Sequence, residues 1–320
     1  MKIFYLIIIY LIVSFNLNSQ NLNYSQFYSS PLNLNPAMTG IGEFGRVGVN
    51  YRNQWPSYLG GIHHFSSWID YNLMNSNFSL GLNISNEFEE VYKLSTSHLS
   101  PSFSYEINLN YDWVLRSGVQ FSVVNSRLNN DLIFLDQFNP DGTIGTSAEN
   151  LMIYGNRNYL SLAMGMLAYS EKIWIGGSIY NLNEPNISFT NEKINLGRLY
   201  SFHIGFTIDK YKMSPSLHFK KQSKFNQLDI GTYFNLEPIN FGIWYRGIPI
   251  DSNNNFNSLI SSLGINFKDL IISYSYDYNF SELSDSGGSH EISIIYNFNF
   301  LGKKMPPKNA RFLQCPIPNF

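Results

Sequence analysis

Short segments in which apolar and polar residues alternate recur between residues 43 and 300 and restrict this part of the chain to a β fold. In one of them, Leu270, Ile272 and Tyr274 share one face of an extended strand, while Ser273 and Ser275 share the other. A period of two is incompatible with a helix there. One face of these strands carries large apolar and aromatic side chains, and the other carries Ser, Gly, Asn and charge. We expect the apolar face to point outward into lipid, the reverse of a soluble barrel.

Fourteen segments of this kind predict an all-β fold, a transmembrane antiparallel up-and-down β-barrel. The predicted strands are 43–53, 62–73, 77–86, 94–107, 112–125, 158–170, 172–181, 199–209, 211–220, 225–235, 239–247, 257–267, 269–279 and 289–300. Their connectors alternate between short turns (74–76, 108–111, 171, 210, 236–238 and 268) and longer loops (54–61, 87–93, 126–157, 182–198, 221–224, 248–256 and 280–288). In bacterial barrels the short turns face the periplasm and the longer loops face outward from the cell.

Aromatic residues flank the predicted short turns. The pairs are Tyr71 with Phe78, Tyr105 with Trp113, Tyr169 with Trp174, and Phe234 with Phe241. Rings at these positions suit the headgroup level of a membrane and predict an interfacial girdle. Aromatic cross-strand pairs in any sheet would give the same pattern. The prediction of a girdle therefore has weight only together with the connector pattern.

The N-terminus has the pattern of a secretory signal. Lys2 precedes an apolar run at 3–13 and a polar stretch at 16–20, so we expect residues 1–19 to be removed as a signal peptide. The predicted organisation is a signal peptide (1–19), an N-terminal periplasmic or plug segment (20–42), the outer-membrane barrel (43–300) and a Pro-rich basic periplasmic tail (301–320).

The C-terminal tail is rich in proline and basic residues and cannot continue the barrel as a strand. Its cations, Lys303, Lys304, Lys308 and Arg311, are candidates for binding a periplasmic partner through an extended arm. A disordered tail is the alternative. The single cysteine, Cys315, cannot form an internal disulfide, and its role stays open.

Four arginines occupy the predicted inward face of their strands. Parity places Arg46 and Arg52 on one face of the first strand, and it places Arg116 and Arg246 on the same face of theirs. These side chains are candidate binding residues for a segment that carries carboxylates. The alternative is that each arginine braces the barrel by pairing with a lumen acid; the candidate acids are Asp70, Glu106, Asp229, Asp277 and Glu291.

Gln54 and Trp55 lie where the first strand meets the first long connector. They complete the set of candidate binding residues, since an exposed aromatic at a loop edge suits partner recognition. An interfacial anchor followed by a turn explains the same residues.

The residues that carry chemistry form neither a catalytic nor a metal-binding pattern. His63 and His64 are neighbours in one strand, so their side chains point to opposite faces and cannot hold one metal together. The other four histidines lie on separate strands without an adjacent acid and nucleophile. We therefore predict no enzymatic activity, no metal and no cofactor. A net charge of −2 also argues against a nucleic-acid partner.

Three separated motifs carry a family resemblance. They are SQFYSSPLNLNPAMTG at 25–40, RVGVNYRNQWP at 46–56 and GGSHEISIIYNF at 287–298. Together they resemble the PorP/SprF family of outer-membrane proteins, which belongs to the type IX secretion and gliding motility system of Bacteroidota. The resemblance runs in order from residue 25 to the tail.

This resemblance implies a non-enzymatic barrel in the outer membrane of a Gram-negative cell, surrounded by outer-membrane lipid. Such proteins support secretion and surface attachment of an adhesin through the adhesin's C-terminal domain, or they anchor a periplasmic ring of the PorK and PorN (GldK and GldN) type. The sequence leaves open which client is served and whether the role is general or dedicated.

The segment Asn35-Pro36-Ala37 is a turn signal, because proline restricts the residue before it. Similar segments occur near the N-termini of FadL-type barrels, in which the N-terminal segment acts as a hatch inside the lumen. Residues 20–42 therefore either plug this barrel or lie beneath it. A FadL-like passive channel for small or hydrophobic solutes is the alternative function.

Overall fold

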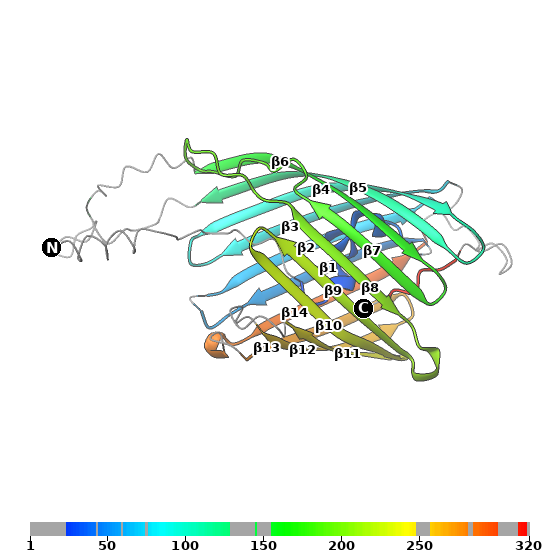
Figure 1. Ribbon diagram of the computed structural model, residues 1–320. Helices are drawn as coiled ribbons and strands as arrows, with labels where there is room; N and C mark the ends of the chain where they lie inside the picture. Colours follow the sequence, from blue (N-terminus) through cyan, green and yellow to red (C-terminus); the bar gives the residue numbers. More distant parts are fainter. Residues whose placement is uncertain are drawn as a thin grey trace, which may run out of the picture.

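The computed structural model describes residues 24–42, 44–58, 60–73, 76–128, 145, 155–247, 257–280, 284–299 and 313–318. Within this part of the chain, fourteen antiparallel strands close into one barrel in which β1 pairs with both β2 and β14 (Figure 1). The strands are β1 (Gly45–Gln54), β2 (Ile62–Asn72), β3 (Phe78–Glu89), β4 (Leu94–Asn108), β5 (Val114–Leu128), β6 (Asn156–Tyr169), β7 (Ile173–Tyr180), β8 (Leu199–Phe206), β9 (Met213–Gln222), β10 (Phe225–Leu236), β11 (Ile239–Arg246), β12 (Ser258–Phe267), β13 (Leu270–Asn279) and β14 (Ser289–Phe298). The predicted up-and-down barrel is confirmed.

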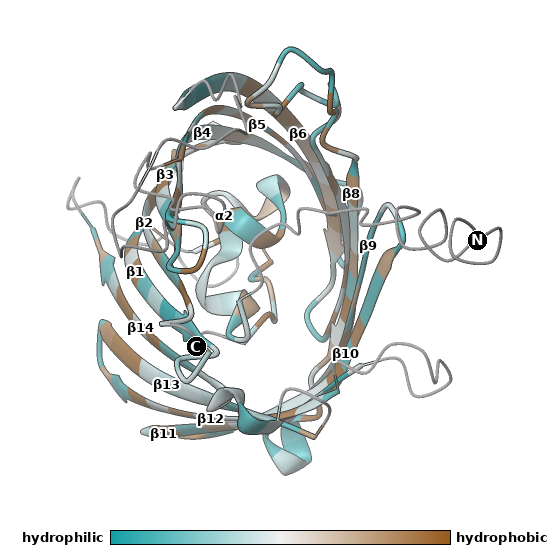
Figure 2. Ribbon diagram, turned by 90° about the vertical axis from the view of Figure 1, so that its left-hand side faces the viewer, coloured by the Kyte–Doolittle hydropathy of each residue, from teal (hydrophilic) through white to brown (hydrophobic). Residues whose placement is uncertain are grey.

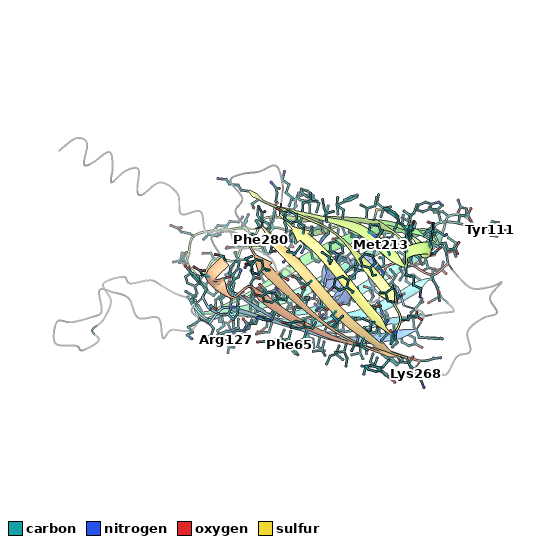
Figure 3. The ribbon with its side chains drawn as sticks, turned by 90° about the horizontal axis from the view of Figure 1, so that it is seen from below. Phe65, Tyr111, Arg127, Met213, Lys268 and Phe280 are labelled. Carbon is teal, nitrogen blue, oxygen red and sulfur yellow. The ribbon has the colours of Figure 1, made fainter. Side chains whose placement is uncertain are left out.

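The connectors divide between two ends of the barrel. We call the end with connectors 73–77, 109–113, 170–172, 207–212, 237–238 and 268–269 the short-turn end, and the opposite end the long-loop end. Tyr111 and Lys268 lie at the short-turn end and Arg127 lies toward the long-loop end (Figure 3).

The strict alternation of short and long connectors is wrong at two positions of the long-loop end. β3 continues to Glu89 and β9 continues to Gln222, which leaves the tight turns 90–93 and 223–224. Lys93 and Ser223 adopt positive φ in these turns. The predicted one-residue turn at Lys210 is also wrong, because a 3-10 helix, η4 (Asp209–Tyr211), stands there.

The outer face of the barrel is apolar, as the alternation predicts. Along β5, Val119, Phe121 and Val123 are exposed while the intervening Gln120 and Ser122 are buried in the lumen. The lipid-facing set is therefore large and apolar, and the inward set is polar. Among the described residues, no helix is both long and apolar enough to cross a bilayer.

The aromatic pairs near the short turns divide between the two faces. Phe78 and Tyr105 are exposed on the outside with ring centroids 4.8 Å apart, which fits a girdle. Tyr169 and Trp174 are instead 2% and 0% exposed and point into the barrel, so their assignment to the girdle is wrong. Both rings belong to the interior core described below.

The N-terminal segment lies inside the barrel. Its short helices are η1 (Phe27–Ser29), α2 (Pro31–Leu34) and η2 (Pro36–Met38), and α2 appears within the ring of strands in Figure 2. Pro31 and Pro36 begin α2 and η2, where a missing N–H costs nothing. The Asn35 side chain then caps η2 by accepting a hydrogen bond from the Ala37 amide at 2.9 Å. Of the two positions left open by the sequence, the described residues 24–42 occupy the lumen, and we call them the plug.

Candidate functional site

The start of the plug is bonded to buried acids on the last two strands. The Ser25 amide donates to Glu291 Oε2 at 2.7 Å, and its hydroxyl donates to Asp277 Oδ2 at 2.6 Å. The next amide, Gln26, donates to Glu291 Oε1 at 3.1 Å, while Ser293 Oγ donates to Gln26 Oε1 at 2.6 Å. Carboxylates that accept backbone N–H groups form strong, charge-assisted hydrogen bonds. These contacts attach the plug to β13 and β14, next to the β1–β14 pair that closes the barrel.

Two arginines neutralise those acids. Arg52 lies 2.8 Å from Asp277 and 3.2 Å from Glu291, and its Nη1 also donates to Ser25 Oγ at 2.6 Å. Arg246 lies 3.0 Å from the same Asp277. Both guanidinium groups are buried, so each charge depends on its partners for stabilisation.

The remaining contact of this network reaches β10. Arg246 Nε lies 3.3 Å from Asp229 Oδ1, and Arg246 Nη2 donates to the Tyr24 carbonyl at 3.4 Å. The network therefore joins the plug to β1, β10, β11, β13 and β14. Ser25, Arg52 and Glu291 come from the three motifs that carry the family resemblance.

A second pair of arginines holds the other end of the plug. Arg116 forms an ion pair with Glu106 and donates to the carbonyls of Ala37 at 3.1 Å and Thr39 at 2.6 Å. Carbonyls near the end of the plug thus receive charged donors from the barrel wall.

Arg46 and Asp70 complete the attachment of the C-terminal end of the plug. Arg46 Nε donates to Asp70 Oδ1 at 3.1 Å, and Asp70 Oδ2 accepts from the Gly40 amide at 2.8 Å. All four predicted lumen arginines are therefore inward, buried and paired with acids, as the bracing alternative expected. Binding of an external carboxylate by these arginines stays a prediction, since such a ligand would have to displace an internal acid.

An aromatic layer packs the middle of the plug against the wall. Trp174 Nε1 donates to the Tyr28 hydroxyl at 3.0 Å. The Phe27 ring lies 4.8 Å from that of Trp244, and Tyr233 lies 5.0 Å from Trp244. Sequence reasoning missed this core, although the inward parity of Trp244 on β11 was readable. At this level aromatic side chains of the plug and the wall pack together in the lumen.

The turn Asn35-Pro36-Ala37 rests on β6, β7 and β8. Asn35 Nδ2 donates to the carbonyls of Met166 at 3.0 Å and Gly177 at 3.2 Å, and it lies 3.2 Å from His203 Nε2. One amide group thus satisfies backbone carbonyls on two adjacent strands.

Residues 313–318 of the C-terminal tail pack against the core that contains the plug. Ile317 is buried in the same core as Phe27 and Tyr28, with Leu313 and Cys315 packed against it. The Thr207 hydroxyl donates to the Pro316 carbonyl at 3.5 Å. Burial raises the pKa of the Cys315 thiol to about 12. Residues 313–318 are therefore not part of a free arm, whereas Lys303, Lys304, Lys308 and Arg311 lie outside the described residues.

The other predicted site residues lie away from the plug. Gln54 pairs with Ile62 and Ser289 at the long-loop end, and the Trp55 amide donates to the Gly288 carbonyl at 2.9 Å. The structure therefore does not bring Gln54 and Trp55 together with the lumen arginines.

The histidines behave as parity predicts. His63 points outward and hydrogen-bonds the Tyr51 hydroxyl at 2.9 Å, while His64 is buried in the lumen 3.1 Å from Glu87. Among the described residues, no cluster of three or more His, Cys, Asp or Glu side chains is placed to hold a metal ion.

A closed antiparallel barrel with an apolar outer belt and an inner plug defines the chain as a transmembrane β-barrel protein. Residues 16–296 match the family of type IX secretion system membrane proteins PorP/SprF. The chain belongs to this family, and the resemblance carried by the three motifs is confirmed.

The fold is similar to that of a solved transporter. The toluene transporter TodX of P. putida has a TM-score of 0.53 and 10% sequence identity, with 83% of this chain and 93% of the transporter covered. A FadL homologue of Pseudomonas aeruginosa has a TM-score of 0.47 and 11% identity, with 83% and 93% covered. Comparison with curated protein sequences finds no significant match.

Proposed function

We propose that this protein is a non-enzymatic outer-membrane component of the type IX secretion system that supports secretion and surface attachment of a client adhesin. Membership of the PorP/SprF family is the observation that carries this proposal. In the proposed topology, the signal peptide is removed, the short-turn end faces the periplasm and the long-loop end faces outward. The client is recognised through its C-terminal domain, and no nucleic acid or cofactor takes part.

The position of the plug argues against passage of a client chain through the lumen. Plug residues bond or pack against strands on all sides of the lumen, from Asp70 on β2 through Trp174 on β7 to Glu291 on β14. A client chain could pass only after the plug had left the lumen. Its departure would change the surroundings of four buried arginines, four buried acids and the half-buried Glu106. We therefore infer that the client meets the outside of the barrel instead of passing through it.

The rival function is a passive channel for small or hydrophobic solutes. The shared fold with a toluene transporter favours it, although 10% identity carries the fold alone. Solutes are much smaller than a polypeptide and need only a local displacement of the plug. The two functions therefore differ in which cargo is lost when the protein is removed.

Gene deletion tests the proposal. We expect the deletion strain to lose one or a few proteins from the cell surface, measured by surface biotinylation and mass spectrometry, while uptake of small aromatic solutes continues at the wild-type rate. Complementation with the intact gene is the control. Normal surface display together with a selective uptake defect would establish the channel and refute the secretion role.

We also propose that the barrel anchors a periplasmic ring of the PorK and PorN type through the cations of the tail. The test replaces Lys303, Lys304, Lys308 and Arg311 by glutamine and leaves residues 313–318 in place, because that segment packs against the core that contains the plug. We expect barrel assembly to continue and recovery of the ring proteins with the tagged barrel to fall severalfold. Glutamine replacement of Lys210 and Lys212, on the same end of the barrel, is the matched control.

A further inference from the structure

The apolar belt ends at a row of polar residues on the outer face, near the long-loop end. On each of the first six strands the outward residue at this position is polar, and the next outward residue toward the short-turn end is an exposed apolar one. We call these polar residues the collar; its members are Asn53, His63, Asn86, Ser97, Asn125 and Asn158. The apolar residues next to them are Tyr51, Phe65, Ile84, Leu99, Val123 and Leu160, which are 42–56% exposed. Asn53 lies opposite His63, and Asn86, Ser97, Asn125 and Asn158 lie opposite one another in order, whereas the outward Phe88 of β3 lies opposite His63 and interrupts the row.

Hydrogen bonds join neighbouring members of the collar. Asn86 Nδ2 donates to Ser97 Oγ at 2.8 Å, and Asn125 Nδ2 donates to Asn158 Oδ1 at 2.6 Å. Side-chain amides and hydroxyls that bond to each other along an outer face are unsuited to hydrocarbon and suited to the headgroup region. The collar therefore marks the boundary of the membrane on this side of the barrel.

Large apolar side chains reappear beyond the collar. Tyr58 is 60% exposed, and Val91 and Tyr92, which follow the collar residue Asn86 along the chain, are 41% and 55% exposed. Lipid tails explain exposed apolar residues below the collar but not these three. Exposed apolar groups in water indicate a binding surface when they gather on a structured support.

The connectors that carry these side chains are fixed to one another. The Trp55 amide donates to the Gly288 carbonyl at 2.9 Å, Ser57 donates to Ser286 at 3.0 Å, and Glu90 donates to Gly61 at 3.2 Å. We call these connectors the loop platform, made of 55–58, 60–61, 90–93 and 284–288. Main-chain bonds between three connectors hold the exposed rings in place before any partner arrives, which reduces the entropy lost on binding.

The loop platform has an acidic rim. The platform carries two acids, Glu90 and Asp285, and one lysine, Lys93, which gives it a net charge of −1. Glu87 and Glu89 share the inward face of β3, where Glu87 pairs with His64, and do not belong to the rim. Lys93 pairs with Glu90 at 2.8 Å, and its ammonium lowers the pKa of that carboxyl, so Glu90 is ionised near neutral pH. An apolar centre with an acidic rim complements an apolar patch surrounded by lysine or arginine.

We propose that the loop platform is the docking surface for a secreted protein domain that presents an apolar patch with a basic rim. The occupant approaches from beyond the membrane, because the platform stands past the collar at the long-loop end. A second copy in the same bilayer would instead meet the barrel at its apolar belt. This inference rests on the proposed function, under which the occupant is the client whose display depends on the barrel.

The test compares aromatic residues at the two ends of the barrel. The double variant Tyr58→Ser with Tyr92→Ser removes the platform rings, and Tyr111→Ser removes a fully exposed ring at the short-turn end (Figure 3). The client is first identified as the surface protein lost on gene deletion. We expect the platform variant to retain about a tenth or less of the client that co-purifies with the tagged full-length barrel, and Tyr111→Ser to retain all of it.

Salt provides a second measurement on the same complex. Replacing Glu90 and Asp285 by glutamine and asparagine should reduce client recovery and also reduce its dependence on ionic strength. Unchanged client recovery by the double tyrosine variant, in a strain where deletion removes the client, would overturn the platform and leave the proposed function standing.

Photo-crosslinking tests the platform even if deletion removes no surface protein. Tyr92→p-benzoylphenylalanine in the full-length protein on intact cells should crosslink to a secreted protein that mass spectrometry identifies. Crosslinks only to lipid, only to a second copy of the barrel, or to nothing would overturn the proposal.

Discussion

Asn35 occupies the space where a side chain on Gly165 would have to stand. A Cβ built on Gly165 falls 1.9 Å from Asn35 Oδ1, and one built on Gly118 falls 2.3 Å from the Ala37 amide nitrogen. These two glycines face each other across β5 and β6. The wall therefore contains a recess that accepts the Asn35-Pro36-Ala37 turn of the plug because no side chain fills it.

The first prediction is that Gly165→Val expels this part of the plug. The valine side chain overlaps Asn35, so the plug loses its amide contacts to Met166 and Gly177 while the barrel strands stay paired. We expect higher single-channel conductance in planar bilayers than the wild-type protein gives. Retained heat-modifiable mobility on gels would show that the barrel itself still folds.

Gly177→Ala is the matched control for this experiment. A Cβ at Gly177 meets only the Ser201 carbonyl at 3.5 Å, an ordinary contact distance. Conductance of this variant should equal that of the wild type. If Gly165→Val conducts no more than Gly177→Ala, the plug does not depend on the glycine recess.

The second prediction concerns the ion pairs at the start of the plug. Arg52→Gln removes the ion pair of Glu291 and one of the two ion pairs of Asp277, whose pair with Arg246 remains. Removal of one partner from a buried ion pair typically costs about 3–5 kcal/mol. We expect a loss of this order in the free energy of unfolding, measured by guanidinium titration in phospholipid bilayers. Lys172→Gln, which removes an exposed pair with Asp209, should leave the unfolding midpoint unchanged.

A double-mutant cycle separates pairing from general damage at this site. Arg52→Gln combined with Asp277→Asn should destabilise the barrel by less than the sum of the two single changes, because the pair couples directly. Strict additivity would show that the two side chains act independently.

Much of the barrel was predictable from sequence because period-two alternation reports directly on the two faces of a strand. The inward positions of Arg46, Arg52, Arg116 and Arg246 follow from parity alone. Each of them also has an acid directly opposite on an adjacent strand: Asp70, Glu291, Glu106 and Asp229, in that order. The pair that strand order does not give is Arg52 with Asp277 on β13, a strand that is not adjacent to β1. Such pairing depends on the curvature of the closed wall and on the plug between the strands.

The inner core was harder to predict for a physical reason. Trp174 lies between Ile173 and Ile175, so an entirely apolar run hides which of the residues faces the lumen. The position of the plug also depends on the width of the lumen, which one strand pattern does not give. The tight turns at 90–93 and 223–224 were missed because polar connectors resemble polar strand ends in sequence.

The third prediction is that the reactivity of Cys315 reports whether residues 313–318 are packed against the core, which we call the seated state of the tail. In the folded protein the thiol packs against the core with Leu313 and Ile317, so maleimide should label it at least about tenfold more slowly than an exposed thiol. Ile317→Asn should release the segment and bring labelling close to the rate of an exposed cysteine. Ile317→Val, which retains the apolar contact, should label slowly.

The Cys315 thiol also makes the seated state of the tail depend on pH. The seated segment has a Cys315 pKa of about 12, whereas a released cysteine ionises near pH 8.5. Because the released state loses its proton first, seating is unaffected below about pH 8.5 and weakens as pH rises toward 12. Labelling corrected for thiolate content should therefore accelerate above about pH 8.5. A constant corrected rate would mean that Cys315 is already exposed.

The fourth prediction tests the belt and the collar on one face of one strand. Val119 and Asn125 both point outward from β5, with Val119 among exposed apolar residues and Asn125 in the collar. An arginine on the lipid face costs about 2–4 kcal/mol near the bilayer midplane and about 0–1 kcal/mol near the interface. Val119→Arg should therefore reduce the folded fraction in liposomes, measured by heat-modifiable mobility, much more than Asn125→Arg. Equal losses for the two variants would mean that the collar does not lie at the membrane boundary, and the exposed rings of Tyr58 and Tyr92 would then have lipid as their partner.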